Sequence, residues 1–200
     1  MRPRRQRIIL ASGSPRRREL LKEHFQLTIK VPRTTELKKA GESPKRYVHR
    51  VALEKWVAAR SQFDLGSKVL PMVSADTIVA IDGRVLGKPK NQTDCMRMMS
   101  RLSGRVHCVS TVVCVGWTTH HSPRFCFRVD SRVSFRKLSK AEITRYVKKN
   151  DWQGKAGGYA IQGEGLHLID AVSGSLTSIV GLPVNETLQA LAHLFSRPPV

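Results

Sequence analysis

The amino-acid sequence predicts a mixed α/β fold, in which helices flank a twisted mixed sheet. The first observation is that short apolar runs alternate with segments of helical periodicity along the 200-residue chain. The second is that the two longest β-rich runs, residues 107–117 and 125–135, follow each other across a polar loop. Strands joined in this way pair antiparallel, so we expect a mixed sheet rather than a purely parallel one.

Capping and turn residues set the boundaries of the elements. Ser14 is a good helix N-cap and Pro15 a good first helical residue, so a strand at 8–11 runs through a loop into a helix that ends near His24. Ser139 and Glu142 have the spacing of a capping box. The other expected strands cover residues 27–31, 69–75 continued by 78–81, 85–86, 166–172 and 176–180; the other expected helices cover 44–60, 91–102, 139–148 and 183–195. Residues 1–200 are expected to form one domain, with a basic lead at 1–7 and a tail at 197–200.

Charge is the unusual feature of the composition. Thirty-five Lys and Arg against 15 Asp and Glu give a formal net charge of +20, although an apolar fraction of 40% is typical of globular proteins. This balance excludes an acid-rich metal buffer. It favours an anionic partner, which can be nucleic acid, an anionic membrane surface or a polyphosphate substrate. A positively charged face can also be simply solvated, without a ligand.

We expect neither a membrane span nor a targeting segment, because no apolar run approaches the roughly 20 residues that cross a bilayer. The basic start, Met1–Arg7, lacks the apolar core of a secretory signal, and strand-like sequence at Ile8 argues against a transit peptide. The four cysteines lack metal-ligand spacing, and we expect buried thiols in a reducing, cytoplasmic compartment rather than a disulfide framework. They are Cys95, Cys108, Cys114 and Cys126.

The loop from Ser12 to Arg17 has the features of an anion-binding site. It joins a strand to a helix, so unpaired backbone N–H groups and the positive end of the helix dipole meet there. Ser12 and Ser14 add hydroxyl groups, while Arg16 and Arg17 add guanidinium groups that match phosphate oxygens. The loop is not a Walker phosphate-binding loop, because the Gly-x4-Gly-Lys-Ser/Thr pattern is missing. The alternative to an anion site is an ordinary capped helix with a solvated basic first turn.

Two carboxylates are candidate metal ligands. Asp76 follows an apolar run, so we expect it at the end of a strand, where α/β proteins often bind ligands. Glu36 lies in a cation-rich loop. Together they can hold Mg²⁺, which takes one or two carboxylates plus substrate phosphates. A turn residue and a surface charge are the alternative roles.

Two lysines and a glycine-rich segment complete the candidate site. Lys55 falls on the apolar stripe of its helix, where it either reaches into a cleft or extends along the surface. Lys88 lies in a Gly-Lys-Pro turn. Residues 154–163 allow close backbone approach to a ligand or simply a tight turn, and Gln162 carries an amide able to read a base edge. The seven histidines show no metal spacing, and we expect His107 to be structural.

Together these motifs resemble those of the Maf family of nucleoside triphosphate pyrophosphatases. The similar segments follow the family's order over almost the whole chain and comprise Ser-Gly-Ser-Pro-Arg-Arg at 12–17, residues 41–44 with 47–48, Ala-Asp-Thr at 75–77, Leu-Gly-Lys-Pro at 86–89, and residues 102–107, 154–163 and 180–183. The resemblance implies a Maf/inosine triphosphatase-like fold with two lobes around a substrate cleft, and often a homodimer. It implies hydrolysis of a nucleoside triphosphate to the monophosphate and diphosphate with a divalent metal, Mg²⁺ or Mn²⁺.

The resemblance also implies residue roles. Glu36 and Asp76 correspond to the acidic pair that binds metal and activates water. We favour Asp76 as the base and Glu36 as the metal ligand, and the alternative is that these two roles are exchanged. The family often has further acids just before this glutamate, whereas residues 33–35 here are Arg-Thr-Thr, which leaves Glu36 less acidic support. The substrate-binding positions are Ser12, Ser14, Arg16, Arg17, Lys55, Thr77, Lys88 and Gln162.

The substrate class follows from the same resemblance. Ala75-Asp76-Thr77 is similar to the branch that acts on dTTP, UTP and modified pyrimidine nucleotides in nucleotide-pool sanitation. One alternative is the same fold acting on another nucleotide, such as 7-methyl-GTP. The other is a basic nucleic-acid-binding protein with weak or no catalysis, although aromatic residues, which single-strand binders use for stacking, are scarce at 6%.

Overall fold

The computed structural model describes residues 5–63 and 68–198. It contains one mixed sheet of seven strands with the order β2-β1-β3-β5-β6-β7, and β4 pairs with β3 off this path. The strands are β1 (Arg7–Ala11), β2 (Gln26–Ile29), β3 (Pro71–Ile81), β4 (Arg84–Leu86), β5 (Val106–Trp117), β6 (Phe125–Phe135) and β7 (Ile169–Ser173). The helices are α1 (Pro15–Lys22), α2 (Pro44–Arg60), α3 (Gln92–Leu102), α4 (Lys140–Lys148), α5 (Leu176–Val180) and α6 (Val184–Phe195), with 3₁₀ helices η1 (Ala156–Gly158) and η2 (Gly163–Leu168). The mixed α/β prediction is therefore confirmed.

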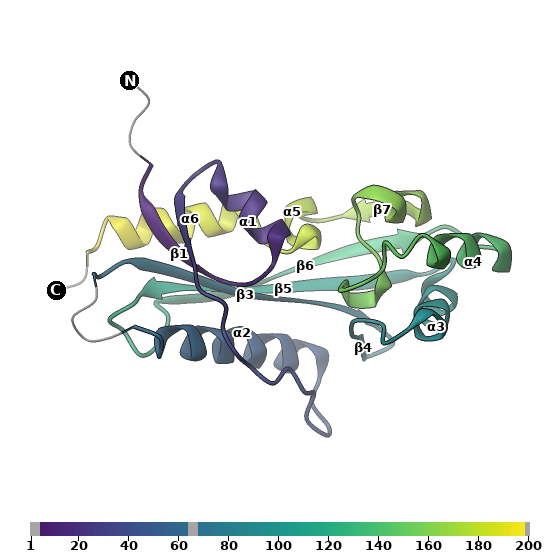
Figure 1. Ribbon diagram of the computed structural model, residues 1–200, viewed down its shortest axis with the longest axis horizontal. Coiled ribbons are helices and arrows are strands. Elements are labelled where there is room, and N and C mark those ends of the chain that lie inside the picture. Colours follow the sequence, from purple (N-terminus) through teal and green to yellow (C-terminus); the bar gives the residue numbers. More distant parts are fainter. Residues whose placement is uncertain (1–4, 64–67, 199–200) are drawn as a thin grey trace.

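Helices cover both faces of the sheet at one end and gather at the other end in a separate group (Figure 1). The face under α1 and α6 has an apolar core that includes Leu10 and Leu191, and the opposite face packs against α2 through Trp56. At the far end, Met99 of α3 and Val147 of α4 share a third core. The long strands β3 and β5 run through both ends, so the two ends are parts of one sheet.

The sheet is parallel at one side and antiparallel in the rest. β1 pairs parallel with β2 and β3, whereas β5 pairs antiparallel with β3 and β6. The expected hairpin of 107–117 and 125–135 is β5 and β6, which confirms that prediction. The turn at Asp82-Gly83 likewise joins β3 to β4, and Gly83 adopts the positive φ of 70° that this turn requires.

Two of the expected strands are wrong or displaced. Residues 176–180 form α5 instead of a strand, because Ser175 caps it by accepting a hydrogen bond from the Ser178 backbone at 3.2 Å. A five-residue apolar run fits either structure, so its periodicity could not distinguish them. Residues 163–168 form η2, and the strand expected at 166–172 begins only at Ile169.

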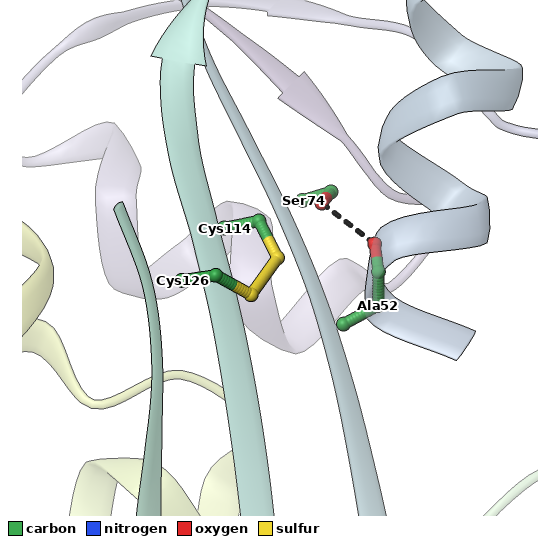
Figure 2. Close-up of a disulfide and its surroundings, with 4 residues drawn as sticks. All are labelled: Ala52, Ser74, Cys114 and Cys126. Atoms are coloured by element: carbon green, nitrogen blue, oxygen red, sulfur yellow. Dashed lines mark hydrogen bonds between the residues drawn. A yellow bond between two sulfur atoms is a disulfide. The ribbon is translucent and has the colours of Figure 1, made fainter. Parts of the chain in front are cut away.

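Cys114 and Cys126 form a disulfide, which contradicts the expectation that all four cysteines are thiols (Figure 2). The two residues face each other in register on β5 and β6, with their Cα atoms 4.2 Å apart. Beside them the Ser74 hydroxyl donates to the Ala52 carbonyl at 3.0 Å and so ties β3 to α2. Cys95 is a buried free thiol, as expected, and Cys108 is a partly buried one.

Across the described residues, no helix combines the length and apolarity that a membrane span requires.

Candidate active site

One cleft of about 660 Å³ contains every residue that the sequence singled out for the site. The cleft takes its walls from the loop after β1, the segment after β2, helix α2, strand β3, the turn after β4 and the glycine-rich segment before η2. The candidate residues among its walls are Ser12, Ser14, Arg16, Arg17, Glu36, Lys55, Asp76, Thr77, Lys88 and Gln162.

The cleft forms where β3 loses β1 as its neighbour on one side, while β5 continues to pair with β3 on the other. β1 pairs with β3 only as far as Ala11 and Ser74, and β4 pairs with β3 from Val79 onward. Asp76 and Thr77 lie between these two pairings, so Asp76 sits in the middle of β3 and not at a strand end as predicted. The ligand-facing position arises because the neighbouring strand stops, which is the same physical opportunity that a strand end provides. Successive residues of a strand point to opposite faces, so Asp76 and Thr77 serve different groups of partners.

Lys55 joins the two carboxylates. Its Nζ lies 2.6 Å from Asp76 Oδ1 and 2.7 Å from Glu36 Oε1. Lys55 is 9% exposed and Asp76 is 6% exposed, so this lysine reaches into the cleft rather than along the surface. A buried lysine and a buried carboxylate are tolerated here because each charge has a partner.

The surroundings shift the pKa values of the two carboxyl groups in opposite directions. Burial raises the pKa of Asp76, although the charges of Lys55 and Arg17 oppose this effect. Desolvation also disfavours ionisation of Glu36, but the hydrogen bond and charge of Lys55, together with the charges of Lys88 and Arg17, outweigh it and hold the pKa of Glu36 below its usual value. The carboxylate of Asp76 is therefore the more basic of the pair.

Helix α2 also fixes the loop that carries Glu36. The Tyr47 hydroxyl donates to the Glu36 carbonyl at 2.9 Å, and Arg50 Nη2 donates to the Leu37 carbonyl at the same distance. Arg50 also contacts Glu42 at 2.7 Å, which holds the far end of the loop. Tyr47 lies in a segment similar to the family, but nothing in the sequence indicates that its hydroxyl positions Glu36.

Arg17 is buried, and three of its five N–H groups form hydrogen bonds with other groups of the protein. Nε donates to the Gly181 carbonyl at 2.8 Å, Nη1 to Ser12 Oγ at 3.1 Å and Nη2 to Thr77 Oγ1 at 3.1 Å. A guanidinium group has five N–H donors, so two remain for a phosphate. Arg17 therefore connects the anion-binding loop to β3 and to the segment after α5.

A buried hydrogen-bond chain continues from Arg17 into the sheet. Thr111 Oγ1 donates its single proton to the Ser178 carbonyl at 2.8 Å, so in its 2.8 Å contact with Thr77 Oγ1 it must accept. Thr77 in turn accepts from Arg17. Thr111 is fully buried on β5 and was not among the predicted site residues. Its position opposite Thr77 depends on the register of β3 and β5, which the sequence does not reveal.

The loop after β1 presents the remaining phosphate-binding candidates. Ser14 is the N-cap of α1 with Pro15 at the start of the helix, as expected, and Ser12 Oγ accepts from the Ser14 backbone at 3.2 Å. In the described parts of the chain, the Ser14 hydroxyl makes no capping hydrogen bond. The Ser14 hydroxyl therefore stays available to a ligand in the cleft that Ser14 and Arg16 line.

The opposite end of the cleft is more apolar. Gly157 donates its backbone N–H to the Gly87 carbonyl at 2.9 Å, which connects the glycine-rich segment to the turn that carries Lys88. Gly157 has a φ of 69°, and a Cβ there would lie 2.9 Å from a methyl group of Val79, so only glycine fits. Tyr159 lines this end of the cleft, and its hydroxyl lies 2.6 Å from His107 Nε2. His107 is thus buried behind the wall of the cleft, in agreement with a structural role.

The donor set fits a divalent cation only in combination with a ligand. Within residues 5–63 and 68–198, no group of three or more His, Cys, Asp or Glu side chains could hold a metal ion. Glu36 and Asp76 can supply two carboxylates, which suits Mg²⁺ when phosphate oxygens complete its coordination. The site is therefore suited to a metal that is bound together with a phosphorylated substrate.

Comparison with known proteins gives one consistent result. A family model described as "Maf-like protein" matches residues 7–194. The chain is 41% identical to a protein named dTTP/UTP pyrophosphatase from Neisseria gonorrhoeae, with 96% of each chain covered. Proteins with the same name from Shewanella denitrificans and Pyrococcus abyssi are 40% and 35% identical; the comparisons cover 94% and 96% of this chain and 96% and 98% of those chains.

Proposed function

The chain belongs to the Maf family, and on this premise we propose that it hydrolyses nucleoside triphosphates to the monophosphate and diphosphate. The names of its relatives support dTTP and UTP as substrates. We extend the proposal to modified pyrimidine nucleotides and to a role in nucleotide-pool sanitation. The observation that carries the proposal is the cleft itself, in which two carboxylates face four cationic side chains. Those cations are Arg16, Arg17, Lys55 and Lys88.

Hydrolysis of this kind depends mainly on positioning and charge stabilisation. We assign Asp76 the role of general base, because burial raises its pKa and it lies in the cleft, where an attacking water can reach it. Glu36 and Asp76 would hold the divalent cation, which supplies charge neutralisation at the phosphates and favours deprotonation of the attacking water. Arg16, Lys88 and the Ser14 hydroxyl bind the triphosphate, and Arg17 fixes the loop while its two remaining donors face phosphate oxygens.

The glycine-rich end of the cleft suits the nucleoside. Tyr159 and Ile179 form apolar wall there, and Gln162 offers both a donor and an acceptor to a base edge. This division places the charged part of the substrate at the loop after β1 and the base near η1.

We also propose that the protein is a homodimer and lies in the cytoplasm. Light scattering tests the oligomeric state, and cell fractionation tests the location.

The test is diphosphate release from a panel containing dTTP, UTP, modified pyrimidine nucleotides and 7-methyl-GTP, with Mg²⁺ or Mn²⁺. Replacing Asp76 by Asn should reduce turnover by at least about 100-fold, since loss of a general base costs 10²–10⁴ in rate. Asp130→Asn is the matched control, because Asp130 is exposed on β6, pairs there with Arg128 and does not line the cleft. Normal turnover by Asp76→Asn would refute its role. Faster hydrolysis of 7-methyl-GTP would overturn the choice of substrate, and salt-sensitive RNA binding without turnover would favour the nucleic-acid alternative.

A further inference from the structure

We propose that Lys55 makes metal binding in this cleft depend on the nucleotide, because its ammonium group already occupies both carboxylates. The inference rests on the proposed function and concerns the order in which the site assembles. Lys55 acts as a built-in cation that holds one oxygen of each carboxylate, Glu36 Oε1 and Asp76 Oδ1, and must release these oxygens before a divalent cation can use them.

The geometry shows how fully the lysine engages this pair. One ammonium group contacts Asp76 Oδ1 at 2.6 Å and Glu36 Oε1 at 2.7 Å, and thus uses two of its three N–H donors on the two candidate metal ligands. The lysine side chain is 11% exposed and that of Asp76 is 8% exposed, whereas that of Glu36 is 39% exposed. Water therefore competes poorly for the contact with Asp76, which is stronger than an ion pair on the surface, and competes better for the contact with Glu36.

The local charge balance points in the same direction. Arg16, Arg17, Lys55 and Lys88 face the cleft with only two carboxylates, so the site already carries an excess of positive charge. Adding a divalent cation alone increases that excess and meets like-charge repulsion. A nucleoside triphosphate brings several negative charges and reverses the balance. Its oxygens also supply the ligands that the two carboxylates lack for an octahedral cation.

The proposed sequence of events follows from these contacts. When the triphosphate enters, Lys55 transfers at least one hydrogen bond from a carboxylate to a phosphate oxygen, and the carboxylates become available to the cation. Metal and nucleotide therefore bind with positive coupling, and by linkage each strengthens the affinity for the other equally. A lysine with only a structural role would hold the carboxylates in place, and its removal would not tighten the binding of metal in the absence of nucleotide.

The experiment measures Mn²⁺ binding by electron paramagnetic resonance, without turnover. Wild type, Lys55→Met and Lys149→Met are titrated with Mn²⁺ alone and with a non-hydrolysable α,β-methylene analogue of dTTP, after subtraction of Mn²⁺ binding to the analogue itself. Lys149 is the matched control, since it forms an exposed ion pair with Glu164 at 2.6 Å outside the cleft. Circular dichroism establishes that each variant is folded.

We expect the analogue to tighten Mn²⁺ binding to the wild type by about tenfold or more, a typical size for coupling between sites. Lys55→Met should bind Mn²⁺ alone about tenfold more tightly than the wild type and show weaker dependence on the analogue. Lys149→Met should match the wild type. The inference is overturned if Lys55→Met binds Mn²⁺ no more tightly than the wild type.

Two further results keep the inference separate from folding and from catalysis. If Lys55→Met fails to fold, Lys55→Gln replaces it in the Mn²⁺ titrations. The wild type alone also tests the proposal, because equal Mn²⁺ affinity of the wild type with and without the analogue refutes it. Diphosphate release at saturating metal is measured separately. A wild type that releases no diphosphate from any substrate refutes the proposed function, whereas the Mn²⁺ titrations still test the role of Lys55.

Discussion

Acidification from pH 6.5 to pH 4 is expected to reduce the free energy of unfolding by about 3 kcal/mol through one side chain, His107. This histidine is 3% exposed, and the rings of Phe135 and Tyr159 meet it edge-on with centroids 5.1 and 5.4 Å away. Its Nε2 has one partner, the Tyr159 hydroxyl, while Nδ1 has none within the described part of the chain. The protonated ring carries an N–H group on both nitrogens, and the one on Nδ1 meets no acceptor in the described residues. Burial accordingly lowers the pKa of His107 to about 4.

The direction and size of the effect follow from proton linkage. In the unfolded chain the imidazole takes up a proton near pH 6.5, whereas in the folded protein it does so only near pH 4. Between these values the unfolded state binds more protons, so stability falls as the pH falls. One pKa unit corresponds to about 1.4 kcal/mol, so the difference between 6.5 and about 4 corresponds to about 3 kcal/mol. Well above pH 6.5 the histidine is neutral in both states, and its contribution to the pH slope vanishes.

Urea unfolding at several pH values between 7 and 4 measures this effect. His107→Gln keeps a side chain able to pair with Tyr159 but cannot titrate, so the stability difference between wild type and variant should change by about 3 kcal/mol over the window. Other groups that contribute to acid sensitivity, such as Glu142, are the same in both proteins and cancel. His120→Gln is the control, because His120 lies exposed after β5 and should follow the wild type. Equal pH slopes for wild type and His107→Gln would refute the reasoning.

Two further predictions concern groups that sequence analysis missed or misjudged. Thr111→Val removes a donor to Ser178 and the nearer acceptor of Thr77, which keeps only the Gly181 carbonyl at 3.3 Å. KM for the nucleotide should therefore rise about tenfold with a smaller change in kcat, and Thr111→Ser should restore it; identical kinetics for the two variants would contradict this role. Reduction of the disulfide between Cys114 and Cys126, which are 12 residues apart, should lower the free energy of unfolding by about 3 kcal/mol in denaturant titrations, whereas the same reductant should leave a Cys114→Ser variant unchanged.

The parts of the site that the sequence predicted correctly depend on local signals. The loop after β1 was recognisable because a serine N-cap and a proline mark the start of α1 within a few residues. Lys55 was recognisable because helical periodicity placed it on the apolar stripe of α2, and in the structure it is buried there. Such patterns depend only on residues that are close in the chain, so they can be recognised without knowledge of the tertiary structure.

The parts that the sequence did not predict depend on contacts between distant segments. Asp76 was expected at a strand end, because nothing near it in the chain shows that β1 stops beside Ser74 and leaves the middle of β3 open. The same limit applies to Thr111, whose partner Thr77 lies on another strand, and to the disulfide, which depends on the register of β5 and β6. An apolar strand with one polar residue is a common pattern. Whether that residue faces a ligand depends on which strand pairs beside it and where that pairing ends.

The structure also changes the meaning of the net charge of +20. Arg17 and Lys55 are buried and already bonded to groups of the protein, so these two cations mainly shape the site. Lys88 is exposed at the rim of the same cleft, where its charge acts over a longer range. Salt screens exposed charges strongly and buried pairs only weakly, so the two kinds of cation differ in what they can do. The exposed cations can therefore attract an anionic substrate from a distance, whereas the buried cations hold the two carboxylates and the phosphate-binding loop in place.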